Sequence, residues 1–541
     1  MKSRGEGART RRLTRDLSAV GLAWALTLNP IARASAQPVA HAPAGELAGV
    51  EQSRAVAFLG IPYAAAPTGD RRWRPPAPPP RWEGVRQAAA FGAICPQPKA
   101  ATSAAGPQSE DCLFLNVWAP RDALAGKLPV MVSIHGGAYI LGSGNLADTS
   151  AYTRDGVILV SINYRLGRLG QFAHPALTAE NPAGPLASYS LMDQVAALRW
   201  VRDNIASFGG DPGNVTIFGC SAGGTYVNLL MASPEARGLF HRAIAESDPF
   251  NTPWPRVQRV GPDRSGSAED AGARFAASLG LDHATAAQLR ELPVEKLLNN
   301  AASNPTDRIQ PIVDGQYVAA QGLVSFQKGA IAHVPYITSI NSWEGVLSRS
   351  FKGTEEILLR NLGPWRDKVL ALHPDSLRQD RTALAAPLMD DVSFRAAQRT
   401  IAGAATKAGL PTWALYFDYV AEPLRATGAP GAAHCDDSSY AFERPDLRAK
   451  FTPTAGDMKV AQTWHKYQVN FAKTGDPNGP SLPAWPRYGG AARILTIRNE
   501  GVAVARNPDA KRMKVLIPAS EAMARGVGLS PPAKPVAANA P

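Results

Sequence analysis

Residues 215–231 read VTIFGCSAGGTYVNLLM, and this stretch decides the fold. The apolar run Val215–Phe218 precedes Gly219-Cys220-Ser221-Ala222-Gly223, and a helix-compatible segment, Thr225–Met231, follows. A Gly-x-Ser-x-Gly sequence between a strand and a helix is typical of a nucleophile elbow, whose tight turn needs small residues two positions either side of the serine. The helix N-terminus beneath the hydroxyl favours developing negative charge. The alternative is a glycine-rich turn with a solvent-facing Ser221, because the pentapeptide alone matches by chance.

The chain around this stretch alternates strands with helices. Leu128–Ile134 (LPVMVSI) and Val157–Ile162 (VILVSI) are apolar runs without alternation, as expected of parallel strands buried on both faces. Between Val157–Ile162 and Val215–Phe218, the segment Leu191–Ser207 carries apolar residues at helical spacing. This order predicts an α/β protein with a parallel sheet. Further strands are expected at Ala243–Ala245, Val334–Ile340 and Trp413–Val420.

Most of the remaining segments are expected to cover that sheet. Residues 255–330 and 353–408 are helical in pattern and more polar, so we expect them to be insertions over the active face. Met458–Lys473 is predicted to be an amphipathic helix. Residues 521–541 form a tail, Pro/Ala-rich from about Ser530, that we expect to be disordered.

The N-terminus has the pattern of a removable export signal. It combines basic residues, a short apolar stretch Leu17–Leu28 and a small-x-small cleavage site, Ala34-Ser35-Ala36. Arg11-Arg12 is compatible with twin-arginine export. We therefore expect residues 1–36 to be a signal peptide, residues 37–520 to be the enzyme domain, and the protein to be secreted or periplasmic. The alternative is a disordered basic tail.

Composition excludes several classes of protein. No apolar run reaches the roughly 18 residues that span a bilayer, so no membrane anchor is expected. The formal net charge is +12, but the segment 1–36 holds seven Lys/Arg and two Asp/Glu, a surplus of five, which leaves +7. Spread over the remaining chain, this charge does not favour nucleic-acid binding. Four cysteines, an even number without a Cys-x-x-Cys pair, indicate disulfides rather than a zinc site.

The strand Leu128–Ile134 leads into His135-Gly136-Gly137-Ala138-Tyr139. A loop of this HGG type supplies backbone N–H groups to the oxyanion of a tetrahedral intermediate. We expect the donors to be the amides of Gly137, Ala138 and Ala222, with His135 as a structural support of the loop. A plain glycine turn is the alternative.

Three histidines downstream of Ser221 are candidates for the general base. His373 precedes a proline in an insertion, and His465 lies within the predicted amphipathic helix. His434 follows the strand around Trp413–Val420 in a Gly/Ala/Pro-rich loop, which can bring an imidazole over the elbow. We therefore predict His434 as general base and then general acid.

The acid is expected between the serine and the histidine in the chain. Glu344 follows the strand Val334–Ile340 and can orient the imidazole. Asp390 and Asp391 are the alternatives, which we interpret as surface charges.

Several longer stretches carry a family resemblance. They include FLGIPYAAAPTGDRRWRPP, SEDCLFLNVWAP, VSINYRLGRLGQFAHP and WHKYQVNFAKTGDPNGP, within about residues 46–490. The chain resembles the type-B carboxylesterase and cholinesterase-like family. This resemblance implies an α/β-hydrolase fold, a mostly parallel central sheet flanked by helices, with the triad Ser221, Glu344 and His434. It also implies a Cys95–Cys112 disulfide.

The chain departs from the family at the residues next to Ser221 and His434. Cys220 stands where Glu usually precedes the nucleophile, and Cys435 stands where Gly commonly follows the histidine. Ala138 stands where several members have a third glycine, a variant familiar in bacterial members, and Ser339 replaces a usual glycine ahead of the acid. Because Ser221 and His434 must come within about 3 Å, their neighbours Cys220 and Cys435 can reach disulfide distance. We predict such a bridge, which resembles that of tannases and feruloyl esterases. Two free buried thiols are the alternative.

The predicted function is that of a secreted serine carboxylic ester hydrolase, acting on small-molecule esters without a metal or organic cofactor. Alternatives are a specialised aryl, feruloyl, polyester or mycotoxin ester hydrolase, an amidase, or a non-catalytic cholinesterase-like binding protein. Without the usual Glu, a preference for choline esters is not expected. Four aromatic residues are candidates for lining the substrate pocket: Tyr139, Phe250, Trp254 and Trp343.

Overall fold

The computed structural model describes residues 37–525, apart from residues 53, 99–105, 124–125, 147–148, 182, 259–266, 299–307, 351–352 and 507–508. The expected signal peptide and the Pro/Ala-rich segment from Ser530 lie outside the described residues. Helix α18, Ala510–Ala524, crosses the boundary expected at residue 520, so the first residues of the expected tail belong to a helix.

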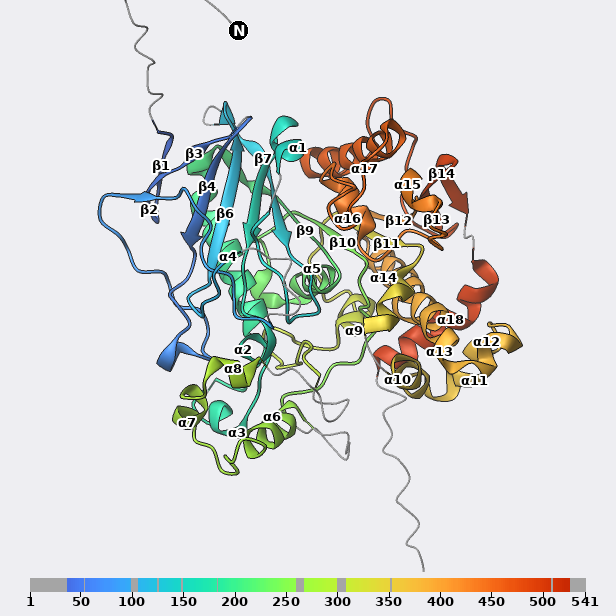
Figure 1. Ribbon diagram of the computed structural model, residues 1–541, viewed down its shortest axis with the longest axis horizontal. Coiled ribbons are helices and arrows are strands. Elements are labelled where there is room, and N and C mark those ends of the chain that lie inside the picture. The colour runs from blue at the N-terminus through green and yellow to red at the C-terminus, as the bar shows by residue number, and fades with distance from the viewer. Residues whose placement is uncertain are drawn as a thin grey trace, which may run out of the picture. The chain divides into compact units, whose positions relative to one another are not determined.

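The fold is organised around an eleven-stranded sheet with the order β14-β13-β12-β11-β10-β9-β7-β8-β6-β4-β3 (Figure 1). From β8 to β13 in this order, neighbouring strands pair in parallel, whereas β14, β6, β4 and β3 pair antiparallel. The expected mostly parallel sheet is confirmed. Its strands are β3 Val50–Glu51, β4 Ala55–Pro62, β6 Phe114–Pro120, β7 Leu128–Ile134, β8 Ile158–Ile162, β9 Gly210–Cys220, β10 Arg242–Glu246, β11 Tyr336–Asn341, β12 Thr412–Asp418, β13 Arg493–Arg498 and β14 Gly501–Arg506. A separate three-stranded sheet contains β1 Val39–Ala42, β2 Gly45–Ala48 and β5 Val85–Gln87.

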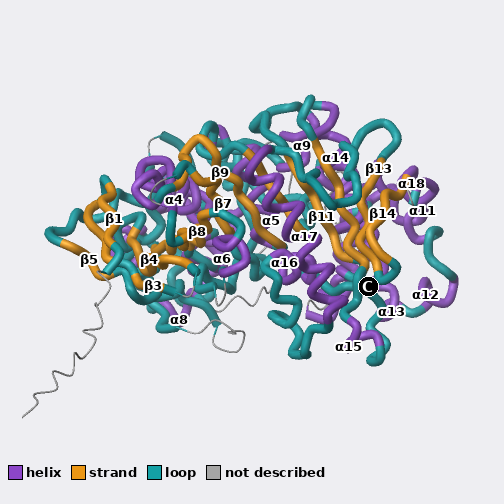
Figure 2. The backbone as a smooth tube through the Cα atoms, turned by 90° about the horizontal axis from the view of Figure 1, so that it is seen from above, coloured by secondary structure: helices purple, strands orange, loops and turns teal. Residues whose placement is uncertain are grey.

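The central strands β7 and β8 are almost wholly buried and mainly apolar because helices cover both faces of the sheet. In β7, Val130 and Val132 pack into one hydrophobic cluster, while Met131 packs into another on the opposite face. Helices α4 Tyr189–Asn204, α5 Ala222–Ala232, α9 Gly322–Gln327 and α14 Ala396–Lys407 contribute to the first cluster. Helices α1 Ser150–Arg154, α16 Asp436–Ala441 and α17 Ala455–Thr474 contribute to the second. Figure 2 shows the strands lying between these helices.

The two expected insertions differ from the prediction in one respect. Residues 353–408 contain α10 to α13, but they end in α14, whose Ile401 and Ala405 pack in the core of the sheet. α14 is therefore a flanking helix, because its apolar face is covered by the strands. The insertion helices are α6 Ala268–Ala277, α7 Ala286–Arg290, α8 Val294–Leu297, α10 Thr354–Asn361, α11 Arg366–Leu370, α12 Asp375–Gln379, α13 Arg381–Met389 and the π-helical turn η9 Asp390–Arg395. Short helices elsewhere are α2 Gly167–Gly170, α3 Pro175–Thr178, α15 Glu422–Arg425, η1 Gly69–Arg71, η4 Ile205–Phe208, η5 Pro234–Ala236, η7 Glu344–Ser350 and η8 Gly363–Trp365.

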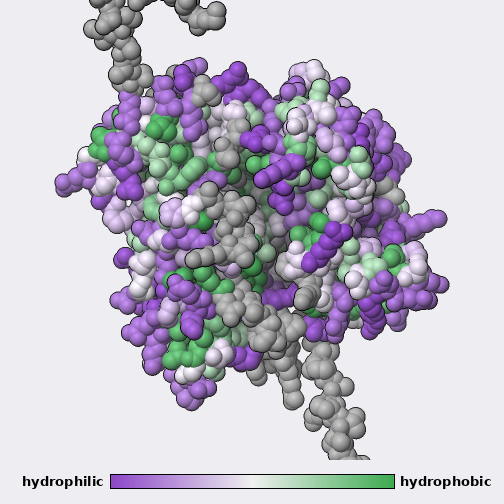
Figure 3. Space-filling model, viewed as in Figure 1, coloured by the Kyte–Doolittle hydropathy of each residue, from purple (hydrophilic) through white to green (hydrophobic). Residues whose placement is uncertain are grey.

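The outer surface is mainly polar. The face in Figure 3 is largely hydrophilic, with apolar residues in separate patches. Large exposed hydrophobic side chains among the described residues are scattered along the chain, at Val85, Phe91, Leu447 and Val504. Scattered residues of this kind are normal on a protein surface. Within the described ranges, no helix has the length and apolar character needed to cross a bilayer.

Candidate active site

Ser221 lies at a sharp turn between β9 and α5. Its φ of 62° and ψ of −127° are unusual for a residue with a side chain, and its amide donates to the Glu246 carbonyl over 2.9 Å. A Cβ atom on either Gly219 or Gly223 would overlap the carbonyl oxygen of Ile134. This close approach to β7 explains why both flanking positions of the motif are glycine.

The loop after β7 lies against this turn. A Cβ atom on Gly136 would come within 2.6 Å of the Cys220 carbonyl oxygen and 3.2 Å of the Ser221 Cβ. Gly137, Ala138 and Tyr139 then follow with successive φ values of 116°, 52° and 66°. The expected oxyanion loop and the N-terminus of α5, which begins at Ala222, are therefore next to the serine.

Glu344 and His434 come together although 90 positions separate them in sequence. Glu344 begins the turn η7 after β11, and its Oε2 lies 2.5 Å from His434 Nδ1. Both side chains are buried, and His434 Nε2 has no hydrogen-bond partner among the described residues. Glu344 Oε1 accepts from Ser247 Oγ over 2.6 Å and from the Asn341 amide over 2.7 Å. The imidazole is thus oriented through Nδ1, which leaves Nε2 available for a proton.

The cysteines form two pairs whose sulfur atoms lie at disulfide distance. The Cα atoms are 5.0 Å apart for Cys95 and Cys112, and 6.0 Å apart for Cys220 and Cys435. A ring nitrogen of His434 lies within 4.8 Å of the sulfur atoms of Cys220 and Cys435. The residues next to the serine and next to the histidine therefore meet.

Comparison with known proteins agrees with this geometry. Residues 36–363 and 365–516 match the model of the carboxylesterase family. The chain belongs to the carboxylesterase family. It is 33% identical over 521 residues to the fumonisin B1 esterase of Sphingopyxis macrogoltabida, covering 90% of this chain and 93% of that protein. It is 33% identical over 502 residues to the para-nitrobenzyl esterase of Bacillus subtilis, covering 88% and 97%. A solved PNB esterase structure superposes with a TM-score of 0.75 at 30% identity, covering 89% of this chain and all of that one. The protein is a carboxylic ester hydrolase.

The alternative acids and bases of this carboxylesterase have other partners. His373 Nε2 lies 3.5 Å from Asp391, and His465 Nε2 lies 3.0 Å from Asp155. The interpretation of Asp391 as a surface charge is wrong, because it is only 2% exposed among His373, Arg395 and Arg512. Asp390 is half-buried and accepts the Gly345 amide over 2.7 Å, and burial raises its pKa to about 7.

His135 is packed within the expected oxyanion loop and is uncharged. Its ring stacks on Tyr164 with the centroids 4.2 Å apart, and its Nδ1 lies 2.8 Å from the Gly136 carbonyl oxygen. Burial lowers the pKa of His135 to about 4, so the ring is neutral.

Sequence reasoning missed two buried carboxyl groups of the carboxylesterase beneath the elbow. Glu246 at the end of β10 and Asp437 in α16 have carboxyl oxygens within 4.8 Å of each other and of Cys220 Sγ. Burial, and then mutual repulsion in the case of Glu246, raises the pKa of both groups. The parallel register places Glu246 beside Cys220, and an acid at the end of a strand next to the elbow was the available signal.

The four candidate pocket residues separate into two groups. Tyr139 is half-buried at the end of the expected oxyanion loop, and Trp343 is half-buried next to Glu344 in the chain. Phe250 and Trp254 are buried in the core, where their ring centroids are 5.3 Å apart and Phe250 packs on Phe326 at 5.7 Å. Phe250 and Trp254 are thus packed as core residues.

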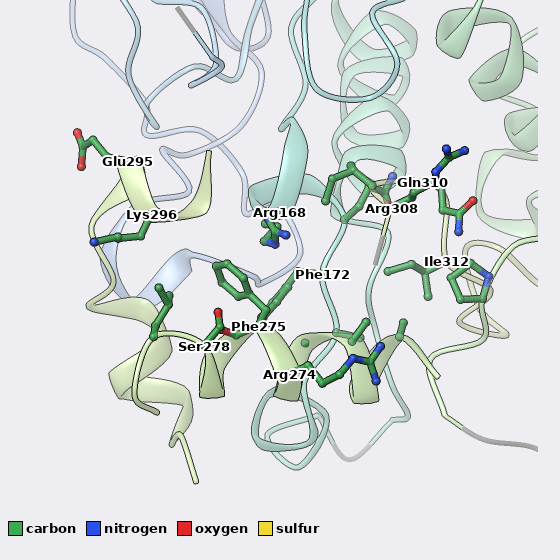
Figure 4. Close-up of a pocket in the computed structure, with 18 residues that line it drawn as sticks. Arg168, Phe172, Arg274, Phe275, Ser278, Glu295, Lys296, Arg308, Gln310 and Ile312 are labelled. Atoms are coloured by element: carbon green, nitrogen blue, oxygen red, sulfur yellow. The ribbon is translucent and has the colours of Figure 1, made fainter. Parts of the chain in front are cut away.

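A distinct cavity of about 350 Å³ lies in the insertion around α6 (Figure 4). Phe172 and Arg168 lie near its middle, and the Glu295 and Lys296 side chains lie off to one side. Arg168 packs over the Phe275 ring at 4.1 Å. Ser221, Glu344 and His434 do not line this cavity.

Proposed function

We propose that this carboxylesterase is an exported serine hydrolase that works through an acyl-enzyme on Ser221. The Ser221 oxygen attacks the ester carbonyl carbon while His434 Nε2 takes the hydroxyl proton. The same proton then passes to the alkoxide as the ester C–O bond breaks and the alcohol leaves. Water repeats the sequence, releasing the acid and regenerating Ser221.

The observation that carries this proposal is the state of His434. Its Nδ1 lies 2.5 Å from Glu344, and its buried Nε2 lacks a partner among the described side chains and backbone. An imidazole held in this way donates from Nδ1 and keeps the Nε2 lone pair for the serine proton. Glu344 in turn is held by Ser247 and Asn341 and stabilises the imidazolium as it forms.

The oxyanion is proposed to lie between the amides of Gly137, Ala138 and Ala222. The contact of Gly136 with the serine turn and the position of Ala222 at the start of α5 support this assignment. Losing one donor of this kind typically costs about 3–4 kcal/mol of transition-state stabilisation. Tyr139 and Trp343 are proposed to line the pocket that receives the ester.

A Cys220–Cys435 disulfide is proposed to bind the elbow to the histidine loop. The 6.0 Å separation of the Cα atoms supports it. The likeness to tannases and feruloyl esterases covers this cysteine motif and does not transfer their substrates. Mass spectrometry after alkylation of the denatured, unreduced protein tests the bridge. We expect no modified cysteine, and one or more alkylated thiols would contradict the two-disulfide assignment.

Export through a removable leader, residues 1–36, fits the two cysteine pairs, because disulfides persist in oxidising compartments. Residues 37–520 with the rest of α18 would then form the mature enzyme domain. N-terminal sequencing of the protein from the periplasm or medium is expected to begin at Gln37. Recovery of the protein in the cytoplasm with an intact leader would contradict export.

The substrate class is tested with a panel of p-nitrophenyl esters of varied acyl length, p-nitrobenzyl esters, aryl esters, anilides and fumonisin B1. Each is assayed with wild type and Ser221→Ala. Ester hydrolysis is expected to fall by about 10⁴-fold or more in Ser221→Ala, as for loss of a serine nucleophile. Equal, slow hydrolysis of every ester by both proteins would favour a non-catalytic binding protein. Anilide turnover above ester turnover would favour an amidase.

A further inference from the structure

The oxyanion loop holds a strained backbone. Ala138 and Tyr139 have φ values of 52° and 66°, in the left-handed region that residues with a Cβ disfavour. Such a conformation persists only where the surrounding contacts determine it. Two contacts of Tyr139 are independent of its hydroxyl: its carbonyl accepts the Gly167 amide over 2.8 Å, and its ring meets the Tyr226 ring edge-on at 5.6 Å. The third contact is made through the hydroxyl.

That hydroxyl begins a chain of hydrogen bonds to a buried carboxylate. Tyr139 Oη donates to Thr225 Oγ1 over 3.2 Å, and Thr225 Oγ1 donates to Asp248 Oδ1 over 2.6 Å. Asn228 Nδ2 donates to the other oxygen, Oδ2, over 2.5 Å. The bonds from Tyr139 and from Thr225 run in series towards Asp248, which also accepts from Asn228, and bonds aligned in series strengthen one another. Thr225 Oγ1 also lies 3.4 Å from the Ser221 carbonyl oxygen, but its 2.6 Å contact with Asp248 is the shorter one.

This chain of hydrogen bonds from Tyr139 through Thr225 to Asp248, called the relay below, connects the two halves of the proposed oxyanion hole. Thr225 lies in the first turn of α5, and its amide donates to the Ser221 carbonyl over 2.9 Å. Tyr139 directly follows Ala138, one of the proposed donors. A hydrogen bond from the loop to the first turn of α5 therefore sets the distance between the loop amides and the nucleophile.

Asp248 is suited to be the terminal acceptor. It is 7% exposed, and burial raises its pKa to about 7 against the opposing hydrogen bonds from Thr225 and Asn228. The titratable groups that face it are Tyr139 from the loop and Tyr336 from β11, and burial raises the pKa of both phenols, so both remain neutral. Ionised or protonated, Asp248 retains an oxygen that accepts from Thr225.

We propose that Asp248 is a positioning residue of the oxyanion hole, acting as the terminal acceptor of a relay that runs from Tyr139 through Thr225. Its role rests on the proposed function, because it acts on donors assigned there. Asp248 does not touch the substrate. It holds the loop in the conformation that stabilises the transition state.

The test compares Asp248→Ala, Thr225→Val and Asp248→Asn with wild type, using kcat, KM and the inhibition constant of an aryl trifluoromethyl ketone. This ketone forms a tetrahedral adduct on a serine and places its oxygen in the oxyanion hole. We expect Asp248→Ala and Thr225→Val to lower kcat about tenfold and to weaken the ketone by the same factor, with KM almost unchanged. This is a fraction of the 10²–10³ that outright loss of a donor costs. Asp248→Asn keeps an accepting oxygen, and the unpartnered Asn228 Oδ1 can accept from the new amide, so this variant is expected to stay close to wild type.

Controls separate positioning from stability and from failure of the proposed function. Tyr467→Phe removes the hydroxyl of a buried tyrosine outside the relay, which donates to the Pro483 carbonyl over 2.6 Å, and is expected to leave ketone binding unchanged. Ser221→Ala must lose activity, and if it does not, the proposed function and the relay both fail. If Ser221→Ala is inactive while Asp248→Ala binds the ketone like wild type, the relay alone is refuted. Equal damage in Asp248→Asn and Asp248→Ala would also overturn it.

Discussion

Replacing both Cys220 and Cys435 with alanine is expected to lower the free energy of unfolding by about 5 kcal/mol. The proposed bridge spans a sequence separation of 215, and a cross-link of that length would restrict the unfolded chain by about this amount. The matched control is Cys95→Ala/Cys112→Ala, whose separation of 17 corresponds to about 3 kcal/mol. Urea denaturation followed by tryptophan fluorescence measures the difference of about 2 kcal/mol between the two variants.

The same perturbation is expected to reduce catalysis through the backbone of the histidine loop. Cys435 has a φ of 65° and a ψ of 19°, a left-handed conformation that costs a residue with a Cβ about 1–2 kcal/mol. Once the bridge is removed, alanine at 435 is expected to relax this turn and to displace His434. The productive population, and with it kcat, should fall about 5- to 30-fold.

Glycine at position 435 isolates this effect. Cys220→Ala/Cys435→Gly lacks the same bridge, but glycine adopts the left-handed conformation freely, so kcat is expected to stay near the wild-type value. The Cys95→Ala/Cys112→Ala control should also keep its kcat. The reasoning is refuted if the alanine and glycine versions have the same kcat, or if the two bridge deletions destabilise the protein equally.

Three further predictions concern buried carboxylates. Glu344→Gln is expected to lower kcat about 10⁴-fold with little change in KM, because His434 loses the acceptor that sets its tautomer. Steady-state and burst-phase kinetics measure this, and an undiminished burst rate would contradict it. Asp193→Asn should destabilise the protein by about 3–5 kcal/mol in urea, since it leaves the buried guanidinium of Arg165 without its carboxylate, and a loss below about 1 kcal/mol would count against it. The pKa of Asp248 rises from 3.8 unfolded to about 7 folded, so its contribution, about 4 kcal/mol, is present below pH 4 and is lost as the pH rises towards 7. Asp248→Asn should therefore flatten the decline in stability between pH 4 and 7, and an unchanged slope would be inconsistent with this linkage.

Local signals in the sequence were sufficient for the central elements. The predicted range of β7, Leu128–Ile134, is also the observed one, and α17 begins three residues before its predicted start at Met458. Both segments could be predicted from local sequence. A strand buried on both faces, such as β7, needs a continuous apolar run, and a helix buried on one face, such as α17, needs a periodic one. The antiparallel strands β4 and β6 were not predicted. Their short apolar runs do not by themselves distinguish a strand from a buried helix. They are strands because β6 pairs with β8 and β4 pairs with β6.

The sequence by itself determined the type of the main elements, the glycines of the elbow and the residues nominated as nucleophile, acid and base. Each of these follows from neighbours in the chain, through steric limits on a turn or the period of apolar residues. Only the tertiary structure decided which distant groups meet: Glu344 with His434, Cys220 with Cys435, and Asp248 with Thr225. It also decided that Asp391 is buried, because His373 and Arg512 approach it from other segments. The pKa of a carboxyl group depends on the water that packing removes and on the charges that packing brings near, and the neighbouring sequence determines neither.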